Sequence, residues 1–233
     1  MVLHNYDIGV DDNMQKGDMV RINFVGRLES GDVFDLTYEE VAKKEGIYSS
    51  RVKYGPIPVI IGAGFLIPGL DNALKEMTVG EKKNVIIEPA DAFGNRDPKL
   101  IHVVPQKTFK DQKVEPRQGM IVDFSGMKGR IQSVTGGRVR VDFNNPLAGK
   151  KLNYRLEIVE KLDVPVEKVK GVFEFFGVYS LEVKIENKEA IIKGKVPQEM
   201  KQKLSAIVID NIAEAEKVTY QESYEKREEK KTE

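Results

Sequence analysis

The chain has 233 residues with 37 basic and 37 acidic side chains, so its formal net charge is zero and gives no overall attraction to nucleic acid or acidic membranes. It contains no cysteine and two histidines, His4 and His102, which excludes disulfides and thiol nucleophiles and leaves no pattern of a metal site or catalytic triad. No apolar run reaches membrane-spanning length and no signal pattern begins the chain, so we expect a cytoplasmic protein.

The N-terminal part predicts an antiparallel hairpin followed by a helix. Residues 19–28 alternate apolar and polar side chains, and a glycine-containing turn joins them to a return strand at 33–36. Thr37 and Glu40 have the spacing of a capping box, so we expect Thr37 to cap a helix that Gly46 ends.

The apolar stretch 60–70 is the centre of this part. It predicts the end of a strand, a glycine-rich bend and a helix from Pro68 to Met77, because proline fits the first helical turn. The three large side chains of Phe65, Leu66 and Ile67 precede that helix and form either core or a binding surface. A further strand is expected at 82–88.

Prolines and glycines mark a change of composition after Gly94. Short strand patterns follow at 100–104, 120–124, 130–134 and 138–143, and a longer one at 152–160. The apolar residues of this segment form either a small core or a face that captures unfolded chain, and the two readings have equal weight. These residues are Ile101, Val103, Val104, Phe109 and Phe124.

Val164-Pro165 marks a second boundary, and residues 166–224 have the order α-β-β-α-β. The second of these helices has a broad apolar face, and the segment offers no catalytic constellation, so we expect an association surface and a homodimer. Residues 226–233 are nearly all charged and are expected to be disordered.

Three motifs stand in a fixed order along the first half of the chain. They are the hairpin Gly26-x-Leu28-x-x-Gly31-x-x-Phe34-Asp35, the helix entry Ile67-Pro68-Gly69-Leu70 and the turn Met77-x-Val79-Gly80-Glu81-Lys82. With Phe93 between small residues and Tyr154 on a late strand, they resemble the FKBP class of peptidyl-prolyl cis-trans isomerases. The segment after Gly94 is similar to the insert-in-flap domain of the SlyD-like branch, and the C-terminal extension resembles its long archaeal members.

The resemblance implies an α+β fold. An FKBP-type antiparallel sheet would wrap on a short helix, with an inserted small β-rich domain and a C-terminal α-β-β-α-β domain. The implied domains are an isomerase domain (1–94 plus 145–162), an insert-in-flap chaperone domain (95–144), a C-terminal association domain (163–225) and a charged tail (226–233).

The resemblance also implies site residues. In the catalytic set, Asp35 would lie beside the rotating carbonyl, the backbone N–H of Ile67 would hydrogen-bond the substrate carbonyl, Phe93 would pack on the rotating amide, and Tyr154 would line the pocket. The substrate-binding residues would be Phe24, Phe34, Leu66 and Leu70 around the proline and Ile101, Val103 and Phe124 in the insert. Family members often have Tyr at the places of Phe24 and Phe93 and Trp at that of Leu70.

The implied reaction needs no metal, cofactor or nucleophile, because an apolar pocket favours the less polar twisted amide over the planar one. We therefore expect a peptidyl-prolyl cis-trans isomerase and folding chaperone that acts on unfolded Xaa-Pro polypeptides, without nucleic acid or membrane partners. The alternative is a binding-only holdase or scaffold with a vestigial site, which Phe93 in place of Tyr keeps open. A nucleic-acid factor is a weaker reading, since its basic residues have no interleaved aromatics. These residues are Lys128, Arg130, Arg138 and Arg140.

Overall fold

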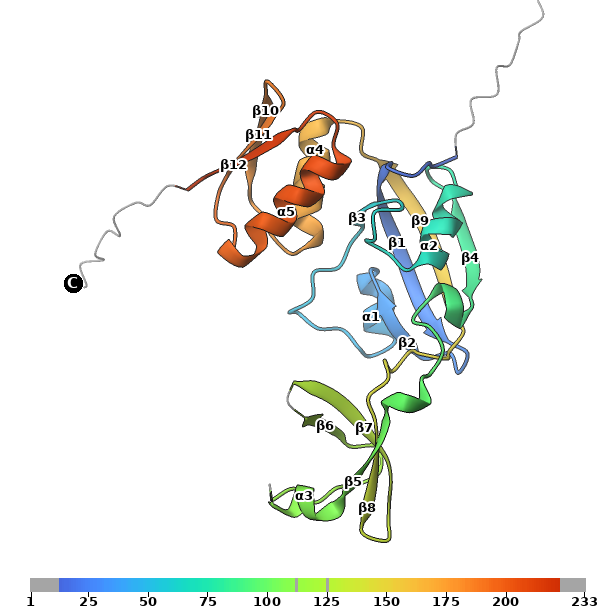
Figure 1. Cartoon of the computed structure of the whole chain (residues 1–233). Helices are drawn as coiled ribbons and strands as arrows, with labels where there is room; N and C mark the ends of the chain where they lie inside the picture. Colours follow the sequence, from blue (N-terminus) through green and yellow to red (C-terminus); the bar gives the residue numbers. More distant parts are fainter. Residues whose placement is uncertain (1–12, 112, 125, 223–233) are drawn as a thin grey trace, which may run out of the picture. The chain divides into compact units, whose positions relative to one another are not determined.

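The computed structural model describes residues 13–111, 113–124 and 126–222. Residues 87–152 form one compact unit, and the described residues on either side of them together form the other (Figure 1). The fold is α+β, as the sequence predicts. The charged tail falls outside the described residues.

The first unit contains a five-stranded sheet in the order β2-β1-β9-β4, with β3 also paired to β1. Its strands are β1 (Met19–Leu28), β2 (Val33–Leu36), β3 (Ile57–Ile60), β4 (Lys82–Ile87) and β9 (Leu152–Lys161). β1 runs antiparallel to both β2 and β3. The alternation seen in the sequence therefore predicts β1 and β2 with their observed ends.

Two short helices accompany this sheet. Helix α2 (Pro68–Lys75) begins at its proline, and its buried residues include Leu70 and Leu74. Helix α1 (Glu39–Lys44) is followed by Gly46 in a left-handed conformation with φ of 70°, so the expected glycine stop is confirmed.

The capping box expected at Thr37 is wrong. Helix α1 begins after Tyr38, and no side chain caps it. The Thr37 hydroxyl instead accepts a hydrogen bond from the backbone N–H of Phe24 (2.9 Å) and donates one to Asn23 Oδ1 (2.8 Å). Thr37 thus still belongs to the hairpin. Its hydroxyl is hydrogen-bonded to β1 and is therefore not available to cap the helix.

The C-terminal elements follow the predicted order α-β-β-α-β. They are α4 (Pro165–Phe175), β10 (Glu182–Glu186), β11 (Glu189–Lys193), α5 (Gln198–Asn211) and β12 (Lys217–Gln221). β11 is the middle strand, antiparallel to β10 and parallel to β12. The apolar residues Leu204, Val208 and Ile212 are buried within this segment's own core.

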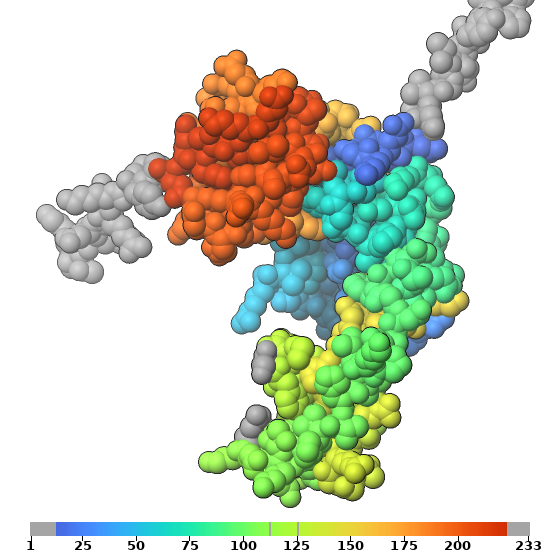
Figure 2. Space-filling view, viewed as in Figure 1, coloured from blue at the N-terminus to red at the C-terminus, as the bar shows by residue number. Residues whose placement is uncertain are grey.

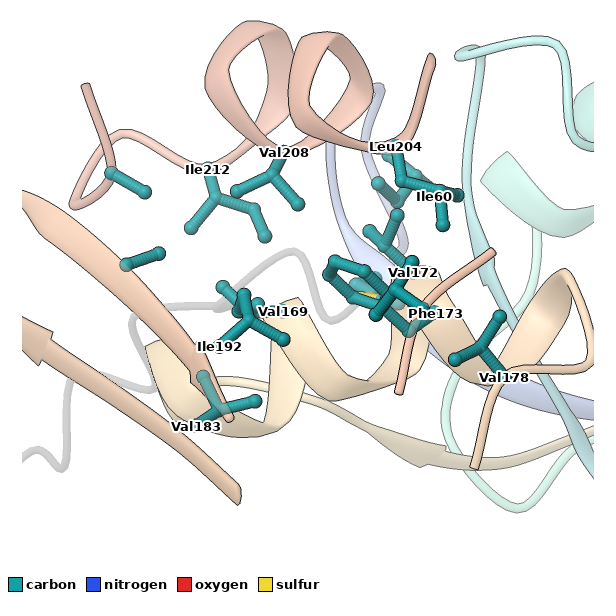
Figure 3. Packing of buried hydrophobic residues seen from close by; sticks show 14 of the residues in the cluster. Ile60, Val169, Val172, Phe173, Val178, Val183, Ile192, Leu204, Val208 and Ile212 are labelled. Carbon is teal, nitrogen blue, oxygen red and sulfur yellow. The ribbon is translucent and has the colours of Figure 1, made fainter. Parts of the chain in front are cut away.

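That core also includes residues of the five-stranded sheet. Met19 of β1 and Ile60 of β3 are each 1% exposed and belong to the same cluster as Val172 and Phe173 of α4 (Figure 3). Gly171 lies at the crossing, where an added Cβ would come within 2.4 Å of Met19 Cε. In Figure 2 the C-terminal segment, coloured orange and red, lies directly against the cyan residues that come after β3 in the sequence. The C-terminal elements and the sheet are therefore packed as one body.

The second unit has a four-stranded sheet in the order β5-β8-β7-β6. Its elements are the 3-10 turns η1 (Pro89–Asp91) and η2 (Pro98–Leu100), β5 (Ile101–Pro105), α3 (Gln106–Asp111), β6 (Ile121–Phe124), β7 (Met127–Thr135) and β8 (Arg138–Asp142). Phe109 of α3 is buried against Ile131, Val139 and Val141. The sequence pattern does not predict the helix at 106–111, because six residues with one large apolar side chain show no helical periodicity.

Candidate active site

Three aromatic rings from separate strands meet on one face of the first unit's sheet. The ring of Tyr154 on β9 contacts Phe24 of β1 and Phe34 of β2 edge-on, with centroid distances of 5.9 and 5.6 Å. Phe24 and Tyr154 are 6% and 5% exposed, while Phe34 is half-buried. The structure thus brings together three residues that the resemblance assigns to the site. A hollow of about 460 Å³ between β1, β4 and β9 also touches Tyr154, but neither Phe24 nor Phe34 lines it, so it is not part of this cluster.

Gly26 makes room for these rings. It pairs with Asp35 across the β1–β2 hairpin. A Cβ on Gly26 would lie 2.8 Å from Phe34 Cζ and 3.0 Å from Tyr154 Cε1, both closer than normal packing allows. In the sequence Gly26 appears only as part of the hairpin motif. Its contact with Tyr154, which requires a glycine, joins distant residues and cannot be predicted from the motif.

Asp35 is the acidic group of this cluster. The residue remains exposed at the sheet edge, yet its carboxylate lies among enough protein for desolvation to raise its pKa, against a hydrogen bond from the Leu36 N–H that lowers it. Burial raises the pKa of Tyr154 as well, and the charge of Asp35 adds to that rise.

The bend before α2 presents a free donor. Ile67 is extended (φ −66°, ψ 149°), and its carbonyl accepts hydrogen bonds from the N–H groups of Leu70 (3.0 Å) and Asp71 (3.2 Å). Within the described part of the chain, the backbone N–H of Ile67 donates no hydrogen bond. Leu66 and Ile67 are half-buried, whereas Leu70 is 3% exposed and belongs to the core.

Asp71 holds this bend and was not singled out from the sequence. Its Oδ1 accepts a hydrogen bond from the Gly62 N–H at 3.0 Å, and Gly62 has a φ of 74°. Burial raises the pKa of Asp71, although the Gly62 hydrogen bond lowers it. An aspartate one turn into a helix that follows a Gly-x-Gly bend is the signal that could have indicated this clamp.

The three apolar residues of the bend have different roles. The Phe65 ring packs on Phe175 and Phe176 at the end of α4, with centroid distances of 4.6 and 6.0 Å. The core reading therefore holds for Phe65, while Leu66 and Ile67 stay half-buried near the free N–H.

The remaining predicted site residues lie in the second unit and are described there by themselves. Phe93 follows η1 and is 36% exposed. Val103 is 62% exposed, and Ile101 is half-buried on the same strand. Phe124 instead packs edge-on against Phe109 at 5.5 Å, so it contributes to the small core. The core reading is therefore confirmed for Phe109 and Phe124, while capture of unfolded chain by the exposed residues stays a prediction.

The described ranges contain no group of three or more His, Cys, Asp or Glu side chains placed to bind a metal ion. No helix in those ranges is long and apolar enough to cross a membrane.

Comparison with known proteins gives two family matches. Residues 11–110 match the family described as FKBP-type peptidyl-prolyl cis-trans isomerase, and residues 102–147 match the family described as FKBP26, IF domain. The chain is 40% identical over 145 residues to a short-type peptidyl-prolyl cis-trans isomerase of Methanocaldococcus jannaschii, covering 62% of this chain and 92% of the relative. It is 30% identical over 128 residues to the isomerase SlyD of Helicobacter pylori, covering 53% and 68%. It is 29% identical over 156 residues to the FKBP-type 16 kDa isomerase of Escherichia coli, covering 65% and 95%.

Proposed function

The chain belongs to the FKBP-type family of peptidyl-prolyl cis-trans isomerases, and from this premise we propose which of its residues carry the reaction. The chain is accordingly a peptidyl-prolyl cis-trans isomerase with relatives named SlyD, and we propose that it also acts as a folding chaperone. The alternative of a binding-only holdase is not favoured, because the relatives of this chain are named as isomerases.

The aromatic cluster would lower the barrier to rotation. Turning a peptide bond out of plane costs about 18–20 kcal/mol in water, since amide resonance is lost. The twisted amide is less polar than the planar one, so the apolar rings of Phe24, Phe34 and Tyr154 favour it over the ground state. Each ~1.4 kcal/mol of this difference gives about a tenfold faster reaction.

The bend before α2 would orient the substrate. An N–H in the first turn of a helix has no partner within the helix and lies at the positive end of the helix dipole. Ile67 is the N-cap residue of α2, and its N–H, which donates no hydrogen bond to a described residue, would donate to a substrate carbonyl beside the proline. Leu66 would contact the proline ring, and Leu70 would support the bend from beneath.

Asp35 would act on the rotating carbonyl through its charge and hydrogen bonds. The observation that carries this proposal is geometric: Asp35 pairs across the hairpin with Gly26, which lies against the rings of Phe34 and Tyr154. For Phe93, packing on the rotating amide stays a prediction from the resemblance.

We further propose that the second unit, with Ile101 and Val103, holds unfolded chain and so raises its concentration near the isomerase site. A homodimer through the C-terminal segment stays a prediction. It would have to use surfaces other than Leu204 and Val208, which are buried in that segment's core. Light scattering at several protein concentrations tests it, and a constant monomer mass would contradict it. A cytoplasmic location and the absence of nucleic acid and membrane partners likewise stay predictions.

Exchange spectroscopy by NMR on a short Ala-Pro peptide tests the site. Wild type should accelerate cis-trans exchange, and Asp35→Ala should lower kcat/KM by about tenfold or more, since a charge acting in an apolar site is removed. Asp32→Ala is the matched control, because Asp32 is exposed in the turn of the same hairpin. If wild type leaves the exchange rate unchanged, the isomerase proposal fails. Equal losses in both variants would refute the role of Asp35.

A further inference from the structure

The sheet of the second unit has one covered face and one open face. Val139 and Val141 are fully buried against α3, so the alternating residues Arg138 and Arg140 of β8 point to the opposite side. On β7, Ile131 is buried and Arg130 is exposed in the same way. The side away from α3 is called the open face below.

The register places basic and aliphatic side chains next to one another on the open face. One row across the four strands reads Ile101, Asp142, Arg130 and Ile121, from β5 to β6. In the adjoining row, Val103 pairs with Arg140. Val103 and Ile121 are each 62% exposed and lie on β5 and β6, the edge strands of this sheet.

The basic side chains of this face have no acidic partners among the described residues. Lys128, Arg130, Arg138 and Arg140 form no ion pair with any described residue. In the first unit, by contrast, cations such as Arg21 and Arg27 are paired with glutamates. Unpaired cations gathered on one side of a sheet are the charge pattern that attracts an anionic partner.

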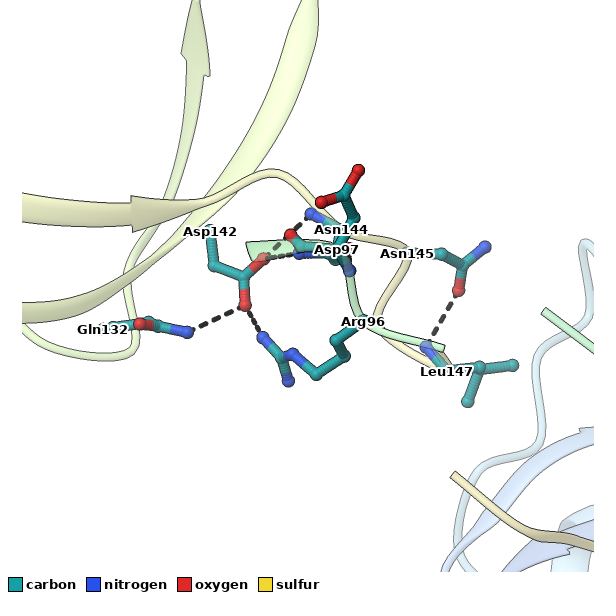
Figure 4. Close-up of polar contacts among 7 residues, drawn as sticks. All are labelled: Arg96, Asp97, Gln132, Asp142, Asn144, Asn145 and Leu147. Carbon is teal, nitrogen blue, oxygen red and sulfur yellow. Dashed lines mark hydrogen bonds and ion pairs between the residues drawn. The ribbon is translucent and has the colours of Figure 1, made fainter. Parts of the chain in front are cut away.

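Asp142 does not neutralise the open face. It is 4% exposed and is taken up by an ion pair with Arg96 and by hydrogen bonds from Gln132 Nε2 (2.8 Å) and Asn144 Nδ2 (2.8 Å), as Figure 4 shows. Asp123, also on this face, accepts a hydrogen bond from the Gly126 N–H at 2.8 Å but keeps its charge, so it offsets one of the four cations Lys128, Arg130, Arg138 and Arg140. The face therefore keeps an excess of positive charge.

A hollow of about 530 Å³ adjoins this face. Its walls include the side chains of Lys128, Arg130 and Lys150 together with the aliphatic surfaces of Ile121 and Pro146. A hollow of this size accommodates a few side chains of an extended peptide. Its walls offer apolar contact and cationic hydrogen-bond donors within the same site.

We propose that the open face binds extended segments of unfolded protein in which acidic side chains are mixed with aliphatic ones. The proposal rests on the chaperone role given above and adds a selection among clients. Carboxylates would pair with Arg130, Arg140 and Lys128, while aliphatic side chains would contact Ile121 and Val103. Unfolded segments rich in lysine or arginine would be repelled.

A polypeptide fits this face better than a nucleic acid. Sequence-tolerant binding of single strands uses aromatic side chains on which bases stack. In the described part of this sheet, Phe124 packs on Phe109 and Phe143 on the covered side. His102 pairs with the buried Val141 and contacts Phe143, so it too lies on that side. The open face offers aliphatic rather than aromatic contacts.

The test uses three labelled peptides of equal length without proline, which share the same leucine and valine positions. The remaining positions are all glutamate, all glutamine or all lysine. In fluorescence anisotropy with the full chain, the glutamate peptide should bind at least about tenfold more tightly than the lysine peptide, and added salt should reduce this preference. Equal affinities for the glutamate and lysine peptides would overturn the proposal.

Charge reversal on each face in turn shows which face produces the preference for the glutamate peptide. The double variant Arg130→Glu/Arg140→Glu should abolish or invert the glutamate preference. Lys107→Glu/Lys110→Glu is the matched control, because it changes net charge equally on exposed positions of α3 at the covered side, and it should keep the preference. Equal losses in both double variants would overturn the proposal. It would also fail if a single-stranded oligonucleotide bound more tightly than the glutamate peptide and lost binding in the open-face variant.

Exchange of the short Ala-Pro peptide, measured in parallel, separates this inference from the isomerase site. The open-face variant should keep wild-type exchange. If wild type shows no exchange but still prefers the glutamate peptide, the proposed site fails while the selection of acidic clients stands.

Discussion

Gly26 illustrates how a residue without a side chain determines the candidate site. It lies in β1 opposite Asp35 and beneath the rings of Phe34 and Tyr154. Its φ lies outside the left-handed region, so its backbone conformation is open to other residues. Glycine is therefore required at this position because a side chain would not fit between the rings.

Gly26→Ala should displace the rings and lower activity. The new Cβ would lie 2.8 Å from Phe34 Cζ, and overpacking of this kind costs about 1–3 kcal/mol of unfolding free energy. We expect kcat/KM for an Ala-Pro peptide to fall by about tenfold, the equivalent of ~1.4 kcal/mol. NMR exchange and thermal unfolding measure the two effects.

Gly129→Ala is the control for this experiment. It creates a similar clash with Val141 Cγ1, at 2.6 Å, in the second unit. It should destabilise that unit and leave peptide exchange unchanged. Unaltered exchange in Gly26→Ala would show that the ring positions do not matter for the reaction.

Elements with regular alternation could be predicted from the sequence, and those fixed by distant contacts could not. The alternation of buried Val20, Ile22 and Phe24 with half-buried polar residues marked β1, Met19–Leu28, although Met19 on the other face is buried as well, against α4. Helix α3 was missed, since it is six residues long and stable only through Phe109 in the core. The helix cap at Thr37 was wrong because β1 uses the hydroxyl.

The candidate site also has parts that could be predicted from the sequence and parts that could not. The motifs placed Phe24, Phe34 and Tyr154 in one cluster, and the strands bring them together. The ring contacts of Phe65 join positions more than a hundred residues apart in the chain, so no local pattern could reveal them. The roles of Asp35 and the other predicted site residues stay predictions.

The contact between Phe65 and α4 should affect the bend that presents Ile67. Phe175→Ala removes the closer of the two rings that hold Phe65, and truncation of a half-buried aromatic side chain costs about 1–3 kcal/mol. Because Leu66 and Ile67 follow Phe65 directly, we expect kcat/KM for an Ala-Pro peptide to fall about threefold to tenfold.

Ile209→Ala is the control, since Ile209 is 43% exposed on α5. It should change neither stability nor exchange. If Phe175→Ala lowers the unfolding temperature but leaves kcat/KM unchanged, the bend keeps its geometry without α4.

On the scale of the first unit, an ion-pair network supplements the apolar core between the sheet and α4. Arg21 of β1 donates a hydrogen bond to Glu174 of α4 at 2.8 Å and forms an ion pair with Glu160 of β9 at 3.1 Å, and Lys53 lies 3.5 Å from Glu174. Burial would raise the pKa of Glu174, but the hydrogen bond and charge of Arg21, with Lys53, outweigh it and lower the pKa below its usual value. Glu174 in turn raises the pKa of Arg21.

The lowered pKa of Glu174 predicts a loss of stability in acid. A carboxylate with a folded pKa below the unfolded one stabilises the folded state above the unfolded pKa, about 4.3, and this contribution is lost as the pH falls through the folded pKa. At about pH 7, Glu174→Gln should cost ~1–2 kcal/mol of unfolding free energy, as expected for a charged hydrogen bond. Once the pH has fallen below the folded pKa of Glu174, the two proteins should converge, because the protonated glutamate is then as neutral as glutamine. Urea unfolding across this pH range measures the difference.

The control variant is Glu214→Gln, at an exposed position after α5, which should show no penalty like that of Glu174→Gln at about pH 7. A Glu174→Gln penalty that stayed constant with pH would assign its cause to packing. The charge of Glu174 would then have no part in holding α4 on the sheet. A penalty that disappears in acid would instead mean that the attachment of the C-terminal elements responds to pH. Since Phe65 packs on Phe175 beside Glu174, the bend that presents Ile67 would respond with it.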